Sequence, residues 1–121
     1  MAYRSKLEER VAGALDDGWK YEPGSYAYLV PRRYTPDFVM HIGTTHSHDE
    51  EAWIEVKGFF RVGDTAKYKA IRKAYPDNRL IMCLQNPNAK VRKGAKLTMA
   101  QWCEKEGWEW TTPADIEEEG L

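Results

Sequence analysis

The spacing of apolar residues predicts a helix near the start of the chain. Ser5 precedes the segment as N-cap and Glu8 follows three residues later, which together form a capping-box pattern. Gly18 suits the position just after the end of such a helix. The apolar residues at helical spacing are Leu7, Val11, Ala14 and Leu15.

Four segments have the composition of strands. Residues 26–30 are rich in strand formers, and Pro31 ends them. Residues 37–42 and 52–57 are expected to be two strands joined by the polar loop 43–51, most simply as a long hairpin. Residues 79–84 predict a short apolar strand.

Two further helices follow from periodicity and caps. Residues 64–75 have helical spacing that Pro76 stops. Thr98 and Gln101 form a second capping box, which opens a helix ending at Gly107, and residues 108–110 predict an edge strand. In the helix over 64–75 we expect Ala66, Ala70, Ile71 and Ala74 to point inward, and Lys67, Lys69, Arg72 and Lys73 to point largely outward.

This order of elements predicts an α/β sandwich around a mixed sheet, in one domain over residues 1–121. Residues 113–121 are acidic and are expected to form a flexible tail. No apolar run approaches the roughly 20 residues of a membrane helix, and no apolar block near Met1 resembles a signal peptide. We therefore expect a cytoplasmic protein. Cys83 and Cys103 lie in apolar contexts and are expected to be buried thiols, not a disulfide.

The net charge of −1 hides a strong asymmetry. Residues 57–96 carry 11 Lys or Arg against two Asp, whereas the segments on either side have an acidic excess. A basic middle between acidic ends is typical of a DNA-facing surface on an otherwise acidic protein. The alternative is a set of solvated helix faces.

The candidate chemistry lies on the strand over 52–57. Alternate side chains of a strand share a face, so Glu55 and Lys57 point together while Ile54 and Val56 point into the core. Hairpin pairing brings Asp37 close to Glu55 or Lys57. Two carboxylates beside a lysine form a reasonable Mg²⁺ site for phosphodiester hydrolysis.

Each of these residues also has a plainer interpretation. The short motif alone is explained by a strand with a surface ion pair, and the capping box alone explains Glu8. His46 and His48 have the character of zinc ligands but no Cys nearby, and His41 is expected to be a packed residue. The aromatic residues expected to be core or edge residues are Trp102, Trp108 and Trp110.

Four motifs in order resemble the phage-type endonuclease I family, the Holliday-junction resolvases of the PD-(D/E)xK nuclease superfamily. The first is the helix motif in residues 3–8, with an aromatic residue, Arg, Ser, Leu and Glu. The two central motifs are Tyr34-Thr-Pro-Asp-Phe38 and Glu55-Val-Lys-Gly58. Lys93-Gly94 and the Trp102 to Gly107 segment match the C-terminal half.

This resemblance implies a restriction-endonuclease-like mixed sheet flanked by helices, in an intertwined, strand-exchanged homodimer. It implies that Glu8, Asp37, Glu55 and Lys57 are catalytic. The three carboxylates, with the Val56 carbonyl as a further ligand, would bind Mg²⁺, for which Mn²⁺ substitutes. Each site would take Glu8 from one chain and the other catalytic residues from its partner.

The implied function is metal-dependent cleavage of four-way and other branched DNA junctions. The alternatives are a sequence-specific or nicking endonuclease of the same fold, of the homing or restriction type, and a non-catalytic DNA-binding module. Two departures from the family stand out: the connection over 26–34 is short, and residues 117–119 are acidic where the family has a basic tail. The expected DNA contacts are Arg4, Arg32, Arg33, Lys67, Arg72, Lys90, Arg92, Lys93 and Lys96.

Overall fold

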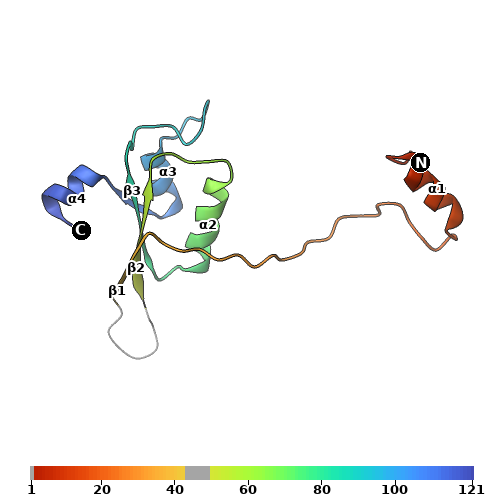
Figure 1. The fold of residues 1–121 in the computed structure, drawn as a ribbon, viewed down its shortest axis with the longest axis horizontal. Coiled ribbons are helices and arrows are strands. Elements are labelled where there is room, and N and C mark those ends of the chain that lie inside the picture. Colours follow the sequence, from red (N-terminus) through yellow and green to blue (C-terminus); the bar gives the residue numbers. More distant parts are fainter. Residues whose placement is uncertain (1, 43–49) are drawn as a thin grey trace. The chain divides into compact units, whose positions relative to one another are not determined.

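The structure is a computed structural model that describes residues 2–42 and 50–121 (Figure 1). It comprises two compact units, Met1–Arg32 and Arg33–Leu121. The first unit holds one helix, and the second holds the sheet with three helices. That all 121 residues act as a single domain stays a prediction.

The first unit contains helix α1, Lys6–Ala14, which begins as its capping box predicts. The Ser5 side chain accepts a hydrogen bond from the Glu8 backbone N–H, and the helix ends at Leu15, before the expected Gly18. None of the α1 residues is buried, and Leu7 is 67% exposed. The apolar stripe of this helix therefore faces solvent within the described chain.

The strand predicted over residues 26–30 does not form, and this prediction was wrong. No strand among residues 2–42 and 50–121 pairs with the segment. Tyr26 is 82% exposed and Leu29 is 97% exposed. Strand-forming side chains produce a strand only when a neighbour supplies both hydrogen bonds and a surface to pack on, and this segment has neither.

The second unit is built on a mixed four-stranded sheet, which confirms the predicted α/β architecture. Its strands are β1, Phe38–His41; β2, Glu51–Lys57; β3, Arg79–Leu84; and β4, Glu109–Thr111, in the order β1-β2-β3-β4. Strand β1 pairs with β2 antiparallel, as the predicted hairpin requires, and the other two pairings are parallel. The parallel pairings need crossovers, which two helices supply.

Helices α2, Asp64–Ala74, and α3, Met99–Glu106, connect the parallel strands and close the core. The inward residues of α2 are Tyr68 and Ile71, whereas the three alanines predicted to point inward are exposed. An aromatic ring and an isoleucine bury far more apolar area than alanine methyl groups, so they set the face that packs. The core also includes Trp53, Leu80, Met82, Leu84, Met99, Trp102, Cys103 and Trp108.

The C-terminal part confirms the capping box predicted at Thr98 and corrects the prediction of a flexible tail. Thr98 and Gln101 form the predicted capping box of α3, and Gly107 ends that helix with φ 82°. The tail expected to fray instead forms helix α4, Pro113–Glu119. The Thr112 side chain accepts from the Asp115 backbone N–H, and Pro113 suits the first turn, so local capping is enough to begin this helix.

Single-residue predictions had mixed outcomes. Cys83 and Cys103 are buried and free, as predicted. Trp102 and Trp108 are buried, which confirms them as core residues. His41, expected to be packed, is exposed, because all four residues of β1 are exposed along the sheet edge. No helix in the described part of the chain is long and apolar enough to cross a membrane.

Candidate active site

Strand β2 carries the predicted site on the face that bears the core. Glu55 lies beside Met82 in the parallel register and Lys57 lies beside Leu84, and both of these neighbours are fully buried. Glu55 itself is only 8% exposed. The prediction that Val56 points into the core was wrong, since it is 48% exposed. The carboxylate therefore lies at the end of the core, where water is scarce.

Asp37 and Tyr34 approach this face from the segment before β1. The β1–β2 ladder starts at Phe38 opposite Ile54, so Asp37 lies one residue beyond it, opposite Glu55. The Val56 N–H donates to Asp37 Oδ2 at 2.8 Å, and the Tyr34 hydroxyl donates to Glu55 Oε1 at 2.6 Å. Each of the two carboxylates is thus held by its own donor.

Lys57 lies between two carboxylates. Its Nζ is 3.7 Å from Glu55 Oε2 and 3.7 Å from Asp64 Oδ2, and the side chain is 18% exposed. The ammonium also lies 5.1 Å from the centre of the Tyr68 ring. Asp64 is the first residue of α2, and its Oδ2 accepts from the Arg61 N–H at 2.8 Å. The start of α2 therefore positions Lys57.

Two tyrosine rings complete the carboxylate cluster, which we define as Tyr34, Asp37, Glu55, Lys57, Asp64 and Tyr68. Tyr68 is fully buried, and its hydroxyl has no hydrogen-bond partner among the described residues. Lys67, one of the expected DNA contacts, has its Nζ 5.5 Å from the centre of the Tyr34 ring and 5.4 Å from that of Tyr68. Cation–π contacts on two rings place this ammonium beside the cluster.

Burial is the largest influence on the pKa values of Glu55, Tyr34 and Tyr68. Burial raises the pKa of Glu55; the Tyr34 hydrogen bond and Lys57 lower it, while the nearby Asp37 charge raises it further. Burial and the Glu55 carboxylate also raise the pKa values of Tyr34 and Tyr68, so both hydroxyls stay protonated at neutral pH. Two adjacent carboxylates that lysine only partly compensates would be stabilised by a bound cation.

The oxygen atoms of the cluster suit Mg²⁺. This ion prefers hard oxygen ligands, keeps several waters and is often held by one or two carboxylates plus a phosphate. Asp37 and Glu55 supply such a pair. Within residues 2–42 and 50–121, no group of three or more His, Cys, Asp or Glu side chains could hold a metal ion. The alternative zinc ligands, His46 and His48, lie outside the described residues.

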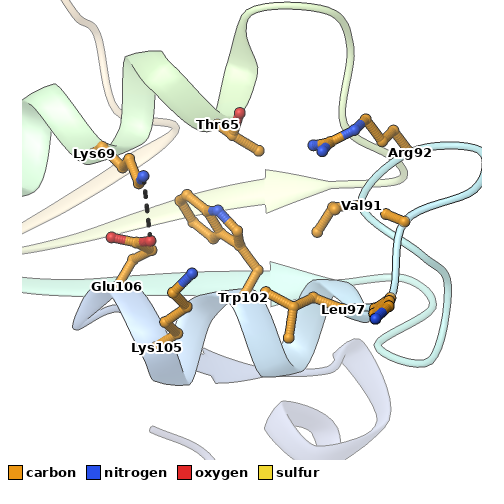
Figure 2. A pocket seen from close by; sticks show the side chains of 10 residues that line it. Thr65, Lys69, Val91, Arg92, Leu97, Trp102, Lys105 and Glu106 are labelled. Carbon is orange, nitrogen blue, oxygen red and sulfur yellow. Dashed lines mark ion pairs between the residues drawn. The ribbon is translucent and has the colours of Figure 1, made fainter.

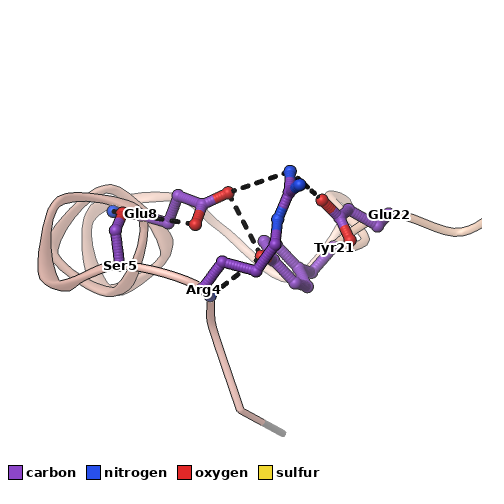
Figure 3. A network of polar contacts seen from close by, with 5 residues as sticks. All are labelled: Arg4, Ser5, Glu8, Tyr21 and Glu22. Carbon is purple, nitrogen blue, oxygen red and sulfur yellow. Dashed lines mark hydrogen bonds and ion pairs between the residues drawn. The ribbon is translucent and has the colours of Figure 1, made fainter.

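Glu8 belongs to the first unit, where its carboxylate is also held by a tyrosine (Figure 3). The Tyr21 hydroxyl donates to Glu8 Oε2 at 3.1 Å, and the Ser5 hydroxyl donates to Oε1 at 3.2 Å. Arg4, an expected DNA contact, forms ion pairs with Glu8 and Glu22. These contacts orient the carboxylate, and a metal-binding role for it stays a prediction.

The other expected DNA contacts differ in how free their charges are. The Arg72 guanidinium donates to the backbone carbonyls of Gly107, Tyr75 and Asn78, and the Lys90 ammonium donates to the Lys96 carbonyl. Those two side chains therefore support the fold in this conformation. The remaining expected contacts are all exposed, and their side chains donate no hydrogen bond to a described residue: Arg32, Arg33, Arg92, Lys93 and Lys96.

Sequence reasoning missed Asp64, Tyr68 and Tyr21 as parts of these networks. Asp64 was interpreted only as the start of a helix, although it lies seven residues after Lys57. Tyr68 stood among four outward lysines and arginines, with no local signal that its ring reaches β2. Tyr34 stood inside a quoted motif, but its hydrogen bond to Glu55 could not be predicted from spacing.

The fold and the cluster define an α/β protein with an acidic, lysine-containing site at the end of a mixed sheet. Residues 1–115 match the family described as phage endonuclease I. The chain is 30% identical over 112 residues to endodeoxyribonuclease 1 of Enterobacteria phage T3, covering 88% of this chain and 68% of that relative. It is 29% identical over 112 residues to endonuclease I of Escherichia phage T7, covering 88% and 70%. The chain belongs to the phage endonuclease I family.

Proposed function

We propose that this protein is a metal-dependent DNA endonuclease that hydrolyses phosphodiester bonds. The observation that carries the proposal is the pairing of Asp37 with the buried Glu55, with the Lys57 ammonium 3.7 Å from Glu55. The names of the phage T3 and T7 relatives, an endodeoxyribonuclease and an endonuclease, support the same reaction. Paired carboxylates and a lysine provide what phosphodiester hydrolysis requires, without a Cys or His nucleophile.

The residues of the cluster would divide the work as follows. Asp37, Glu55 and the Val56 carbonyl would hold Mg²⁺ or Mn²⁺, which polarises the phosphate and lowers the pKa of a bound water. Lys57 neutralises negative charge that develops on the phosphate, or orients the attacking water. The Tyr34 hydroxyl and the Val56 N–H fix the two carboxylates in place beforehand.

For the substrate, we propose branched DNA, above all four-way junctions, cut by a homodimer with a PD-(D/E)xK fold. Exposed apolar residues support exchange of segments between two chains: Tyr26, Tyr28 and Leu29 are at least 82% exposed, and α1 buries none of its residues. A partner chain would cover these side chains. Glu8 of one chain would then complete the site of the other.

The test of catalysis uses a synthetic four-way junction and a linear duplex of matched sequence. With Mg²⁺ the unmodified protein should cut the junction in preference to the duplex. Glu55→Ala should abolish cutting, and Lys57→Ala should abolish it while leaving DNA binding largely intact. Asp77→Ala, which removes an exposed carboxylate from the turn before β3, is the matched control and should cut normally. Unchanged cutting by Glu55→Ala would reject the assigned site.

An alternative keeps the fold and reaction but changes the substrate to a linear site, as in a sequence-specific or nicking endonuclease. The acidic residues of α4, including Glu117 and Glu119, favour it, because they stand where the family has a basic tail. Cutting of duplex as fast as junction would support this alternative. Metal-independent binding without cleavage products would instead indicate a non-catalytic DNA-binding module.

The dimer has its own test. Light scattering should give twice the chain mass of 14.0 kDa. Mixing Glu8→Ala protein with Lys57→Ala protein, after conditions that allow chains to exchange, should restore part of the activity, since one of the two sites would be complete. A monomeric mass would reject the dimer, and a dimer whose mixture stays inactive would reject sharing of sites.

A further inference from the structure

The same unit has a second feature, a cationic one, beside the carboxylate cluster. An open pocket of about 270 Å³ lies between α2, the loop over residues 91–97 and α3 (Figure 2). Lys69, Arg92 and Lys105 reach it from these three segments, and Lys96 also lines it. Four cationic side chains thus converge on one small hollow, which we call the basic pocket.

The charge of the basic pocket is only partly compensated. Of the residues that the structure describes, Glu106 is the single acidic one that lines it, and its Oε2 is 3.5 Å from Lys69 Nζ. Among the described residues, Arg92, Lys96 and Lys105 form no ion pair. A hollow lined by charges of one sign focuses the electrostatic field and attracts a counter-ion. The pocket therefore favours an anion.

The loop that carries two of these cations is held by its backbone. The Val91 N–H donates to the Leu97 carbonyl at 3.1 Å, and the Ala95 N–H donates to the Arg92 carbonyl at 3.1 Å. Gly94 stands at the third position of that turn with φ 80°, a conformation that a glycine adopts without strain. Arg92 and Lys96 are thus presented on a preformed turn, which reduces the entropy lost on binding.

The position of the pocket connects it to the carboxylate cluster. Thr65, which lines the pocket, directly follows Asp64 of the cluster. Thr65 and Lys69 are four residues apart on one strip of α2, and Asp64 and Tyr68 occupy the neighbouring strip. The first turn of α2 therefore separates the two features, and a polyanion lying across that turn would contact both.

We propose that the basic pocket binds an internal phosphate of the DNA strand that is cut, next to the scissile phosphate. This inference rests on the proposed function. A phosphate suits the pocket better than a base does, because Trp102, the only aromatic residue that lines it, is 4% exposed and offers little surface for stacking. Arg92 and Lys96 supply the charge-assisted donors, and the bound phosphate fixes where the strand lies on the cluster.

The test measures binding of junction and duplex DNA without divalent metal, over a series of salt concentrations. The variant Arg92→Gln with Lys96→Gln removes the two loop cations. Loss of one phosphate contact should reduce the slope of log K against log salt by about 0.9, or roughly eightfold weaker binding at 0.1 M salt. The control, Lys20→Gln with Lys73→Gln, removes the same charge from exposed positions outside the pocket and should change binding much less.

Chemical substitution in the DNA backbone identifies the phosphate that binds in the basic pocket. Neutral methylphosphonates placed one at a time beside the cut should weaken binding of the unmodified protein at one position, and the variant should be insensitive there. Under cleavage conditions, the variant should raise KM, because the phosphate contact in the basic pocket contributes to binding of the DNA.

Each outcome bears on a different claim. Three results would overturn the internal-phosphate pocket. The control could lose as much DNA affinity as the pocket variant, or the pocket variant could lose none. The loss of affinity could also be confined to strands with a terminal 5′ phosphate. Failure of the unmodified protein to bind or cut DNA would overturn the proposed function instead. All four substituted side chains are exposed, and matching thermal melts would confirm that both variants fold.

Discussion

The hydrogen bond from Tyr34 to Glu55 is the contact of the cluster that a single substitution removes most cleanly. Tyr34→Phe deletes the hydroxyl that donates at 2.6 Å and keeps the ring. The ring contacts with Trp53 and Tyr68, at 5.8 and 6.1 Å between centroids, can then persist. The change therefore tests one donor rather than the packing around it.

A hydrogen bond to a charged group stabilises a fold by roughly 1.5–3 kcal/mol. For a unit the size of Arg33–Leu121, each kcal/mol corresponds to roughly 4–8 °C in Tm. At neutral pH, Tyr34→Phe should therefore lower the Tm by at least about 6 °C. We expect kcat to fall about 10- to 100-fold, because a carboxylate that is no longer held samples unproductive positions.

The losses of Tm and kcat in Tyr34→Phe should depend on pH, because the strength of the hydrogen bond depends on whether Glu55 is protonated. The Tyr34 hydrogen bond favours ionised Glu55 and so lowers its pKa, against the larger effect of burial that raises it. Without the hydroxyl the pKa of Glu55 rises further, and the acidic limb of the pH–rate profile should move to higher pH. The loss in Tm should shrink below the pKa of Glu55, because a neutral hydrogen bond is worth less, about 0.5–1.5 kcal/mol.

The measurements are thermal melts and cleavage rates over a pH series with Mg²⁺. Tyr75→Phe is the control, since Tyr75 packs against Trp53 in the same unit and its hydroxyl donates no hydrogen bond to a described residue. A Tyr34→Phe protein with an unchanged Tm and an unchanged pH–rate profile would refute the reasoning that this hydroxyl holds Glu55.

Three further predictions concern the same unit. Without metal, the unmodified protein should lose stability as pH rises through the raised pKa of Glu55, because its folded state binds that proton more tightly than its unfolded state. Glu55→Gln should therefore have a higher Tm than the unmodified protein above that pKa. Mg²⁺ should raise the Tm of the unmodified protein only. Asp64→Asn keeps an acceptor for the start of α2 but removes one ion pair of Lys57. Cleavage should therefore slow roughly tenfold with little change in Tm. A normal cleavage rate would show that Asp64 does not position Lys57. Thr98→Ala should cost about 1 kcal/mol in a denaturation curve and leave kcat unchanged, because the α3 cap lies outside the cluster; a large fall in kcat would contradict this.

Much of the site could be predicted from strand geometry. Alternation put Glu55 and Lys57 on one face, and the hairpin brought Asp37 opposite Glu55. Which face of β2 packs against the core could not be predicted. Ile54 and Val56 are as apolar as Trp53, and alternation alone does not tell which side of the strand a helix covers. Tyr68 and Ile71 of α2 decided it by packing on the Trp53 face.

The segment over 26–30 shows the opposite limit. Its residues have high strand propensity, and yet no strand forms among the described residues. A strand is a property of a pair, so a single segment cannot determine it. The prediction of a flexible acidic tail was wrong for a different reason. Its composition indicated fraying, but the local cap at Thr112 is enough to begin α4.

The features that can be predicted from the amino-acid sequence depend on neighbours within about four residues. These are the caps of α1 and α3 and the shared face of Glu55 and Lys57, since backbone geometry sets such contacts locally. Packing between segments far apart in the chain brings Asp64 and Tyr68 to Lys57, and Tyr34 to Glu55 across 21 residues. Those contacts depend on how α2 and the segment before β1 pack on the sheet, and the burial of many side chains together settles that packing.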